Sequence, residues 1–205
     1  MRLYLVRHGR TQWAEEGRYC GTSDPPLIAA GEEQARSLAR RLAGEPIGRI
    51  FSSPRLRATR TAVILADTLK LPLEVLPLLG EIDYGAWEGL TRAEITSRFP
   101  EEWRAYEARP DVSSPPGGEN GLQTWRRARG ALRHIWTAGA DRAPLVVAHR
   151  TLNRVLLCRV LGLPLRWSRR LEQAETCLNI LEMAAPLRAA TLLCFNDTCH
   201  LQPPR

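Results

Sequence analysis

The hydrophobic and polar positions of this 205-residue chain follow two alternating patterns, which predict strands and helices in turn. Two uninterrupted apolar runs, residues 3–6 and 145–148, are typical of strands buried on both faces of a sheet. Between them, apolar residues recur three and four positions apart over residues 31–44 and 57–69, which predicts two amphipathic helices. The other predicted elements are strands at 50–51 and 73–76, helices at 91–98, 101–109 and 122–137, an almost entirely apolar helix at 152–161, and late strands at 177–182 and 190–195.

Strands that alternate with helices of this length predict βαβ units and a mainly parallel sheet. The pattern changes between Gly80 and Gly121, where Gly, Pro, Trp and acidic residues dominate. We expect this stretch to form a small helical insertion, about residues 90–121, that covers the active-site edge of the sheet. The expected fold class is therefore α/β: a three-layer α/β/α sandwich with a mainly parallel central sheet, built by residues 1–205 as one domain.

The same spacing assigns side chains to faces. In the helix at 57–69 it places Arg57 and Arg60 opposite the apolar face. In the helix at 122–137 it directs Trp125, Leu132, Ile135 and Trp136 toward the core.

Composition indicates a globular protein of the cytoplasm. No apolar run approaches the roughly 20 residues that cross a bilayer. Arg7 and Arg10 interrupt the N-terminal apolar segment before it reaches the length of a signal peptide. The five cysteines are odd in number and lack C-x-x-C spacing, so we expect reduced thiols and no zinc site.

The chain carries a formal net charge of +7, and Lys70 is the only lysine among its 29 basic residues. A basic balance is one mark of a nucleic-acid-binding protein. Here the arginines are spread through helical segments rather than gathered in one run, which favours a solvated surface. Their planar guanidinium groups suit phosphate and carboxylate, so we expect a small anionic partner and neither a nucleic-acid nor a membrane partner.

Two of the four histidines directly follow the buried strands. His8 comes after the run at 3–6 with Arg7 beside it, and His149 comes after the run at 145–148. The carboxyl ends of parallel strands meet at one edge of a sheet, where α/β proteins bind their ligands. Arg57, in the first turn of a helix that follows a third strand, reaches the same edge. Two arginines and two histidines without an acidic metal-binding cluster predict a site for phosphate or another oxyanion.

These residues belong to a longer set of motifs that resembles the histidine phosphatase (phosphoglycerate mutase-like) superfamily. The motifs occur in the family's order over most of the chain: LVRHGRT at 5–11, GRY at 17–19, DPPL at 24–27, SSPRLRA at 52–58, EIDYGAWEG at 81–89, PGGE at 116–119 and VVAH at 146–149.

The resemblance implies a catalytic role for five residues. His8 would be the nucleophile and form a phosphohistidine, and Glu81 would be the general acid and base. Arg7, Arg57 and His149 would hold the equatorial phosphoryl oxygens. The positive charges would also lower the pKa of His8 and keep its ring neutral. Such a mechanism requires neither a metal nor another cofactor.

The resemblance also implies substrate contacts from Thr11, Cys20, Gly21, Tyr84, Arg150 and His200. The segment at 196–201 is similar to the ending of metal-independent phosphoserine phosphatases, which would place His200 over the site near a substrate carboxylate. Against this, Cys20 and Tyr84 stand where those phosphoserine phosphatases carry other polar residues. For Arg150 two positions stay open: contact with the non-phosphate end of the substrate, or solvent at a helix start.

Three positions depart from the family pattern. Ala14 stands where many members carry an Asn that helps to bind the phosphate, so one hydrogen bond is expected to be missing or to be supplied by another residue. Arg10 stands where Glu or Gln is more usual, and its role is open. Arg150-Thr151 follows His149 where Gly-Gly is commoner.

Hydrolysis of a small phosphorylated metabolite is the expected function, and two alternatives stay open. The cofactor-dependent mutases of this family are longer between the positions of Glu81 and His149, so the short insertion here favours hydrolysis over phosphoryl transfer. A non-catalytic phospho-ligand or nucleic-acid binder would not need the nucleophile or the acid, and both are present. In such a binder Trp87, Trp103 and Tyr106 would stack on bases, whereas in an enzyme they would lie in a lid over the site.

The substrate is open among phosphoserine, α-ribazole phosphate, phosphoglycerate and a broad range of monoesters. The expected assembly is a monomer or a homodimer.

Overall fold

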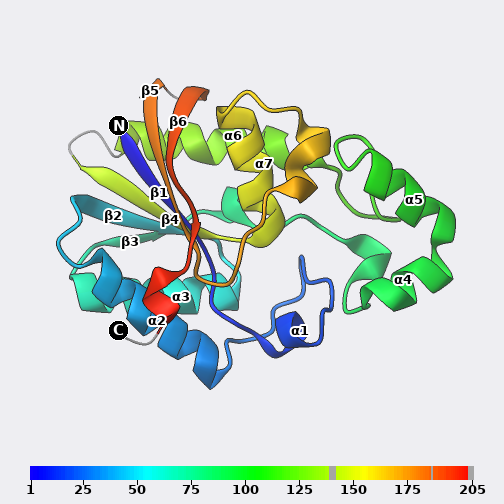
Figure 1. Cartoon of the computed structure of the whole chain (residues 1–205), viewed down its shortest axis with the longest axis horizontal. Helices are drawn as coiled ribbons and strands as arrows, with labels where there is room; N and C mark the ends of the chain where they lie inside the picture. Colours follow the sequence, from blue (N-terminus) through cyan, green and yellow to red (C-terminus); the bar gives the residue numbers. More distant parts are fainter. Residues whose placement is uncertain (139–141, 186, 203–205) are drawn as a thin grey trace.

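The computed structural model describes residues 1–138, 142–185 and 187–202. Figure 1 shows strands in the centre of the molecule, helices on two sides, and α4 and α5 set apart at the right. In chain order the elements, with η for a 3-10 helix, are β1 (Arg2–Arg7), α1 (Gln12–Glu15), α2 (Ala29–Leu42), β2 (Ile47–Ser52), α3 (Leu56–Leu69), β3 (Leu73–Val75), η1 (Pro77–Leu79), η2 (Gly85–Trp87), α4 (Arg92–Arg98), α5 (Pro100–Ala108), α6 (Gly121–Ala138), β4 (Ala143–Ala148), α7 (Arg150–Val160), η3 (Leu165–Arg170), β5 (Leu178–Ala185), β6 (Arg188–Asp197) and η4 (Cys199–Leu201).

The strands form one sheet, whose order in the described residues is β3-β2-β4-β1-β5-β6. The first four strands of the chain pair in parallel, whereas β5 runs antiparallel to β1 and β6 antiparallel to β5. In the parallel register Leu5 lies beside Val146. The carboxyl ends of β1, β2 and β4 therefore meet at one edge, where the chain continues as His8, Ser53 and His149.

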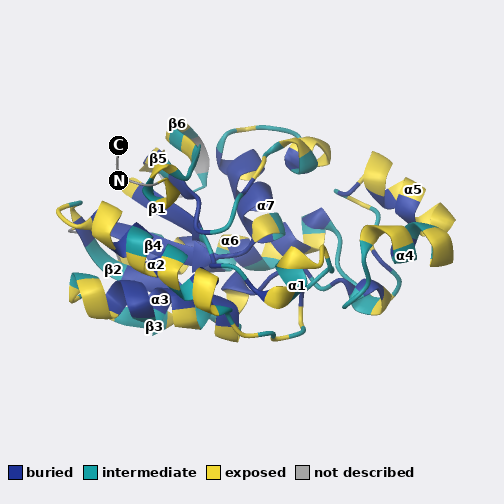
Figure 2. Cartoon of the chain, turned by 60° about the horizontal axis from the view of Figure 1, so that its bottom comes forward, coloured by how far each residue is buried: buried dark blue, intermediate teal, exposed yellow. Residues whose placement is uncertain are grey.

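Consecutive strand residues point to opposite faces of the sheet, which explains why the apolar runs are continuous. In β1, Leu3 and Leu5 pack with α6 and α7, whereas Tyr4 and Val6 pack with α2 and α3. Figure 2 shows the resulting layers, with buried strands between helices whose outer faces are exposed. The predicted three-layer α/β/α sandwich with a mainly parallel sheet is confirmed.

The predicted insertion contains α4 and α5 and has a hydrophobic cluster of its own. Thr91 begins α4 with a reciprocal cap: Glu94 N–H donates to the Thr91 hydroxyl, and Thr91 N–H donates to the Glu94 carboxylate. Trp87 and Trp103 lie inside this cluster and are 0% and 4% exposed. A ring must be exposed to stack on a nucleic-acid base, and neither of these rings is.

Among the details that differ from the sequence pattern, three have a clear structural cause. Arg57 is buried while Arg60 is exposed, because the first turn of α3 lies against a loop whose carbonyl groups bind the Arg57 guanidinium. Trp136 is only half-buried, since its neighbour Ile135 takes the core position. Strands β5 and β6 are longer than predicted, because they continue to pair with each other beyond the residues that face β1.

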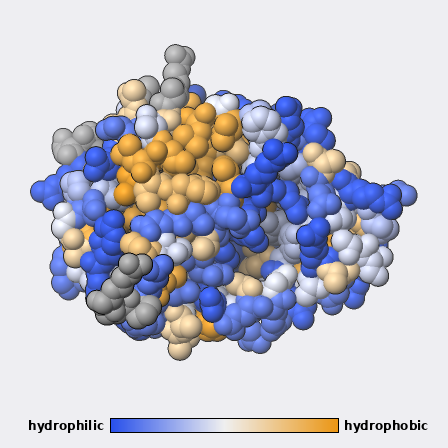
Figure 3. Space-filling model, in the orientation of Figure 1, coloured by the Kyte–Doolittle hydropathy of each residue, from blue (hydrophilic) through white to orange (hydrophobic). Residues whose placement is uncertain are grey.

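On the face seen in Figure 3, hydrophobic surface gathers over β6, the last strand of the sheet. Leu193 and Phe195 contribute to it, with exposed fractions of 48% and 39%. The surface between this patch and the insertion is mostly hydrophilic. Among the described residues, no helix combines the length and the apolar character that a membrane span requires.

Candidate active site

His8 directly follows β1, and its ring is held in one tautomer. Nδ1 lies 2.7 Å from the Gly9 carbonyl oxygen. Because a carbonyl oxygen only accepts, Nδ1 carries the proton and Nε2 keeps a lone pair. Burial, and then the charges of Arg57 and Arg7, hold the pKa of His8 well below the ordinary value of 6.5. The ring is thus neutral near physiological pH, and Nε2 has the lone pair that a nucleophile needs.

Arg57 places a fixed positive charge beside His8. Its side chain is almost fully buried at the start of α3. The guanidinium donates to three carbonyl oxygens, those of Ser23 at 2.7 Å, Gly21 at 3.0 Å and Cys20 at 3.2 Å. These bonds hold the planar group in one orientation, as recognition of a phosphoryl group requires.

Arg7, the last residue of β1, supplies the second buried guanidinium. It donates to the Gln173 carbonyl oxygen at 2.8 Å and lies 3.4 Å from the Glu175 carboxylate. Burial lowers its pKa, and the charge of Glu175 acts in the opposite direction. Within the described part of the chain, Nε of Arg7 and Nε of Arg57 are buried and lack a hydrogen-bond partner. Unpaired buried donors are uncommon and mark a place where a ligand could accept.

His149 follows β4 and lies next to His8. The two ring centroids are 5.2 Å apart, in an edge-to-face arrangement. Its Nε2 shares a hydrogen bond of 2.7 Å with the Ser53 hydroxyl, and its buried Nδ1 lacks a partner among the described residues. Burial, and then the charge of Arg57, hold the pKa of His149 well below 6.5.

Glu81 lies at the N-terminus of α7 and accepts three backbone hydrogen bonds. Ile82 N–H and Leu152 N–H donate to Oε1, and Thr151 N–H donates to Oε2, each at 2.9 Å. A carboxylate is favoured at this end of a helix, because the first N–H groups are free and the helix dipole is positive there. Glu81 is 7% exposed and faces the same cavity as His8.

These residues surround a cavity of about 410 Å³. Of the residues that the sequence proposes for the site, those on its wall are Arg7, His8, Thr11, Cys20, Arg57, Glu81, Tyr84 and Arg150. Gly21, His149 and His200 are not among the described residues that line it. Ala14 lines it with a methyl group, so no side-chain hydrogen bond comes from that position. Arg10 is not on the wall and lies 3.7 Å from carboxylate oxygens of Glu15 and Glu175.

The structure places His200 outside the cavity. Its Nε2 shares a hydrogen bond of 3.1 Å with the Thr176 hydroxyl, and η4, which contains it, packs against α2. The tail follows β6 down the side of the molecule instead of crossing the carboxyl edge of the sheet (Figure 1). His200 contacts the site only indirectly, because Thr176 N–H donates to the His8 carbonyl oxygen.

The loop with Cys20 and Gly21 depends on a residue that the sequence analysis did not single out. Glu88 accepts from the N–H groups of Gly21, Thr22 and Ser23, at 2.8, 3.0 and 3.2 Å. The loop carbonyls in turn bind Arg57. A side chain at Gly21 would overlap Ile82 O, so glycine permits the close approach of the two segments. Burial raises the pKa of Cys20 to about 11, so Cys20 stays a neutral thiol.

The sequence analysis also missed several arginines of the cavity wall. Among the described residues, seven arginines and two glutamates line the cavity. Arg154 is four residues after Arg150, on the same face of α7, a spacing that could have indicated it. Arg169, in η3, has no such signal, since the insertion that it contacts is distant in sequence. In the described part of the chain, no three His, Cys, Asp or Glu side chains are grouped so as to hold a metal ion.

Comparison with known proteins identifies the family. Residues 3–198 match the histidine phosphatase superfamily, branch 1. Phosphoserine phosphatase 1 of Hydrogenobacter thermophilus is 32% identical over 203 residues, which cover 98% of this chain and 94% of that protein. A probable phosphoglycerate mutase GpmB of Yersinia enterocolitica is 35% identical over 210 residues, covering 100% and 96%. A mycobacterial glucosyl-3-phosphoglycerate phosphatase structure is similar with a TM-score of 0.87 and 28% identity, covering 95% and 98%.

The chain belongs to the histidine phosphatase superfamily. The names of its relatives support a phosphatase or a mutase, both of which act on phosphorylated substrates.

Proposed function

We propose that the protein hydrolyses phosphomonoesters of small metabolites through a phosphohistidine on His8. The observation that carries the proposal is the state of the His8 ring: Gly9 O holds the proton on Nδ1, and burial with two guanidinium charges keeps Nε2 unprotonated. The unpaired buried donors of Arg7 and Arg57 support it, because both residues line the cavity and phosphoryl oxygens would accept from guanidinium groups there.

In the first step Nε2 of His8 attacks phosphorus, and the bond from phosphorus to the ester oxygen breaks. In the substrate complex Glu81, on the wall of the same cavity, carries a proton and gives it to the departing oxygen. The guanidinium groups of Arg7 and Arg57 offset the charge on the equatorial oxygens of a loose transition state.

In the second step a water molecule attacks phosphorus and the P–N bond breaks. Glu81 takes the proton of the water, inorganic phosphate leaves, and His8 returns to its neutral form. These steps use no metal ion, so hydrolysis should continue in EDTA.

Phosphoryl transfer between two hydroxyl groups is the second candidate, and the similarity to a probable phosphoglycerate mutase favours it. A mutase must keep the phosphoryl group on histidine until a second hydroxyl arrives. The two reactions therefore differ in whether water reaches the phosphohistidine.

The test is phosphate release in EDTA from phosphoserine, 3-phosphoglycerate and an aryl phosphate. His134→Ala is a matched control for His8→Ala, because His134 is exposed and bonds to Glu74 outside the cavity. We expect release with the wild type and with His134→Ala, but none with His8→Ala. A rapid quench with radiolabelled substrate should find acid-labile phosphate on His8.

Two outcomes would overturn the proposal. If His8→Ala retains the activity, His8 is not the nucleophile. If the wild type releases no phosphate but isomerises 3-phosphoglycerate when bisphosphoglycerate is added, the protein is a mutase.

A further inference from the structure

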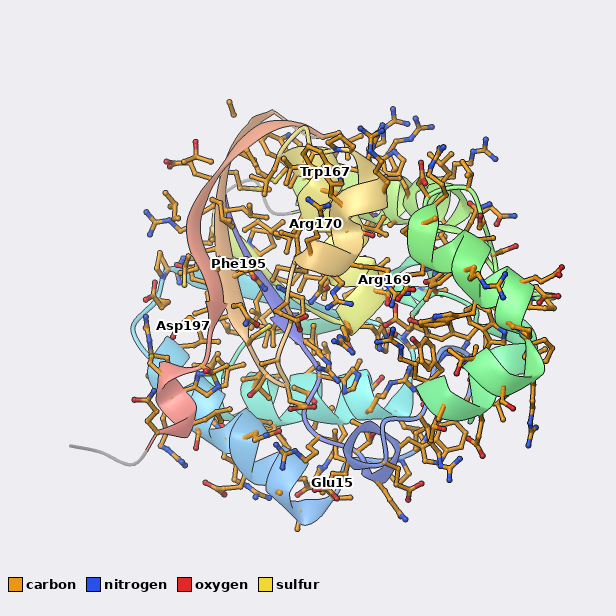
Figure 4. The ribbon with its side chains drawn as sticks, turned by 45° about the vertical axis from the view of Figure 1, so that its right-hand side comes forward. Glu15, Trp167, Arg169, Arg170, Phe195 and Asp197 are labelled. Atoms are coloured by element: carbon orange, nitrogen blue, oxygen red, sulfur yellow. The ribbon has the colours of Figure 1, made fainter. Side chains whose placement is uncertain are left out.

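Three arginines form a positively charged part of the cavity wall that the hydrolytic steps do not use. Arg150 and Arg154 lie on α7 and Arg169 on η3, and we call them the α7–η3 arginines. In Figure 4 Arg169 lies between η3 and the insertion, whereas Arg170 and Trp167 lie farther up η3. The side chains of this group thus meet at the cavity from two elements that pack against each other.

The positive charge of these arginines is only partly offset. Arg150 and Arg154 share one carboxylate, that of Glu172, at 3.4 and 3.2 Å. The Glu172 side chain is 65% exposed, so water screens its contribution. Within the described residues no carboxylate lies within 4.0 Å of the Arg169 guanidinium. Two of the three arginines therefore share one exposed carboxylate, and the third, Arg169, has no carboxylate partner among the described residues.

Contacts with neighbouring residues hold the guanidinium groups of Arg154 and Arg169 in place. The Arg154 side chain is 9% exposed, and its Nε donates to the Leu171 carbonyl oxygen at 2.6 Å. Arg169 lies over two rings of the insertion, 4.9 Å from the centroid of Trp103 and 5.5 Å from that of Tyr106. Contacts of this kind orient a guanidinium without neutralising it.

Like charges held close together repel one another, and the repulsion is felt most by Arg154, which is 9% exposed, whereas Arg150 is 49% exposed and partly screened by water. Burial, and then the charge of Arg150, lower the pKa of Arg154, which shows the direction of the effect. An anion bound between these groups would remove the repulsion and accept their free N–H donors.

We propose that the α7–η3 arginines form a second anion subsite, which binds a carboxylate or a second phosphate of the substrate while its first phosphoryl group lies at His8. As a statement about the substrate, this inference rests on the proposed function. The ligand would be a small phosphomonoester with a further acidic group, and a cavity of about 410 Å³ has room for both ends.

The binding test compares ligands that differ only in the second acidic group. Calorimetric titration of the His8→Ala protein, which avoids turnover, would use phosphoserine against phosphoethanolamine. A sugar bisphosphate against the matching sugar monophosphate tests a second phosphate at a longer spacing. A charged hydrogen-bonded pair corresponds to a factor of about ten or more in affinity, so we expect at least one acidic ligand to bind that much more tightly.

Arg150→Gln and Arg169→Gln, each in the His8→Ala background, test the subsite itself. Both should reduce the preference for the acidic ligand about tenfold and leave the affinity for the non-acidic ligand within about twofold. Arg170→Gln is the matched control, since it removes the same charge one residue away, where the side chain lies over Trp167 rather than in the cavity. It should leave the preference unchanged.

The subsite is overturned if acidic and non-acidic ligands bind equally, or if Arg170→Gln lowers the preference as much as Arg169→Gln. Failure of the proposed function has a different result. If the protein binds acidic ligands selectively but the wild type does not hydrolyse them, the subsite proposal stands and the phosphatase proposal is wrong. If the wild type hydrolyses each acidic ester and its non-acidic counterpart equally well, the protein is a phosphatase without this subsite.

Discussion

Replacing Glu81 by glutamine should separate two functions of one side chain, since the carboxylate both caps α7 and faces the cavity. Glutamine has the same shape and keeps Oε1, which accepts from the N–H groups of Ile82 and Leu152. In place of Oε2 it presents an NH₂ group, which cannot accept from Thr151 N–H. The variant therefore loses one charged hydrogen bond and the negative charge at the helix N-terminus.

The cost in stability follows from those two losses. A buried N–H left without an acceptor costs about 1–3 kcal/mol. The favourable interaction of the charge with the helix dipole contributes about 0.3–1 kcal/mol. We expect the free energy of unfolding to fall by about 2 kcal/mol, from these ranges. The catalytic effect should be larger, because loss of a general acid lowers kcat by a factor of about 10²–10⁴.

Urea unfolding and steady-state kinetics measure the two effects separately. The loss of kcat should be large for phosphoserine, whose alkoxide leaving group needs a proton, and smaller for an aryl phosphate with an acidic phenol. Glu94→Gln is the matched control, since Glu94 also accepts from a backbone N–H, that of Thr91, but outside the cavity. This control should lose some stability and keep its kcat.

Two results would refute this reasoning. If Glu81→Gln keeps kcat for phosphoserine within about threefold, far less than a general acid contributes, Glu81 is not the acid. If its unfolding free energy equals that of the wild type, the Thr151 hydrogen bond and the charge of Glu81 do not stabilise the start of α7.

Three further predictions concern other parts of the site. The pKa values of His8 and His149 are depressed in the folded protein, so below pH 6.5 the unfolded chain binds more protons than the folded one. The free energy of unfolding, measured with urea, should therefore fall as the pH drops below 6.5, and it should fall less steeply in His149→Gln. Arg57→Lys keeps the charge but loses the planar group that binds three carbonyls, and kcat/KM should fall about 100-fold, as misplacement of a binding group does. Gly85 has a φ of +49°, and a Cβ there would overlap Pro116 O, so thermal denaturation of Gly85→Ala should show a loss of at least about 2 kcal/mol.

The sequence alone determined the layers of the fold. Continuous apolar runs at 3–6 and 145–148 require strands covered on both faces, and helices of period 3.6 between strands supply that cover. The predicted sheet, its main helices and the insertion follow from these local patterns, because burial of apolar side chains depends on periodicity along the chain. The position of His8 and His149 at one edge follows as well, since both come directly after parallel strands.

Only the tertiary structure decided how the site is completed. Arg57 lies on the polar side of its helix by spacing alone, yet it is buried, because carbonyls from a loop more than thirty residues away bind it. His200 is similar in position to a family residue, yet Thr176 and α2 hold it outside the cavity. Arg169 reaches the wall because η3 packs against α7, and its guanidinium lies over two rings of α5. Such contacts join segments far apart in sequence, and the geometry of folding, rather than any local pattern, brings them together.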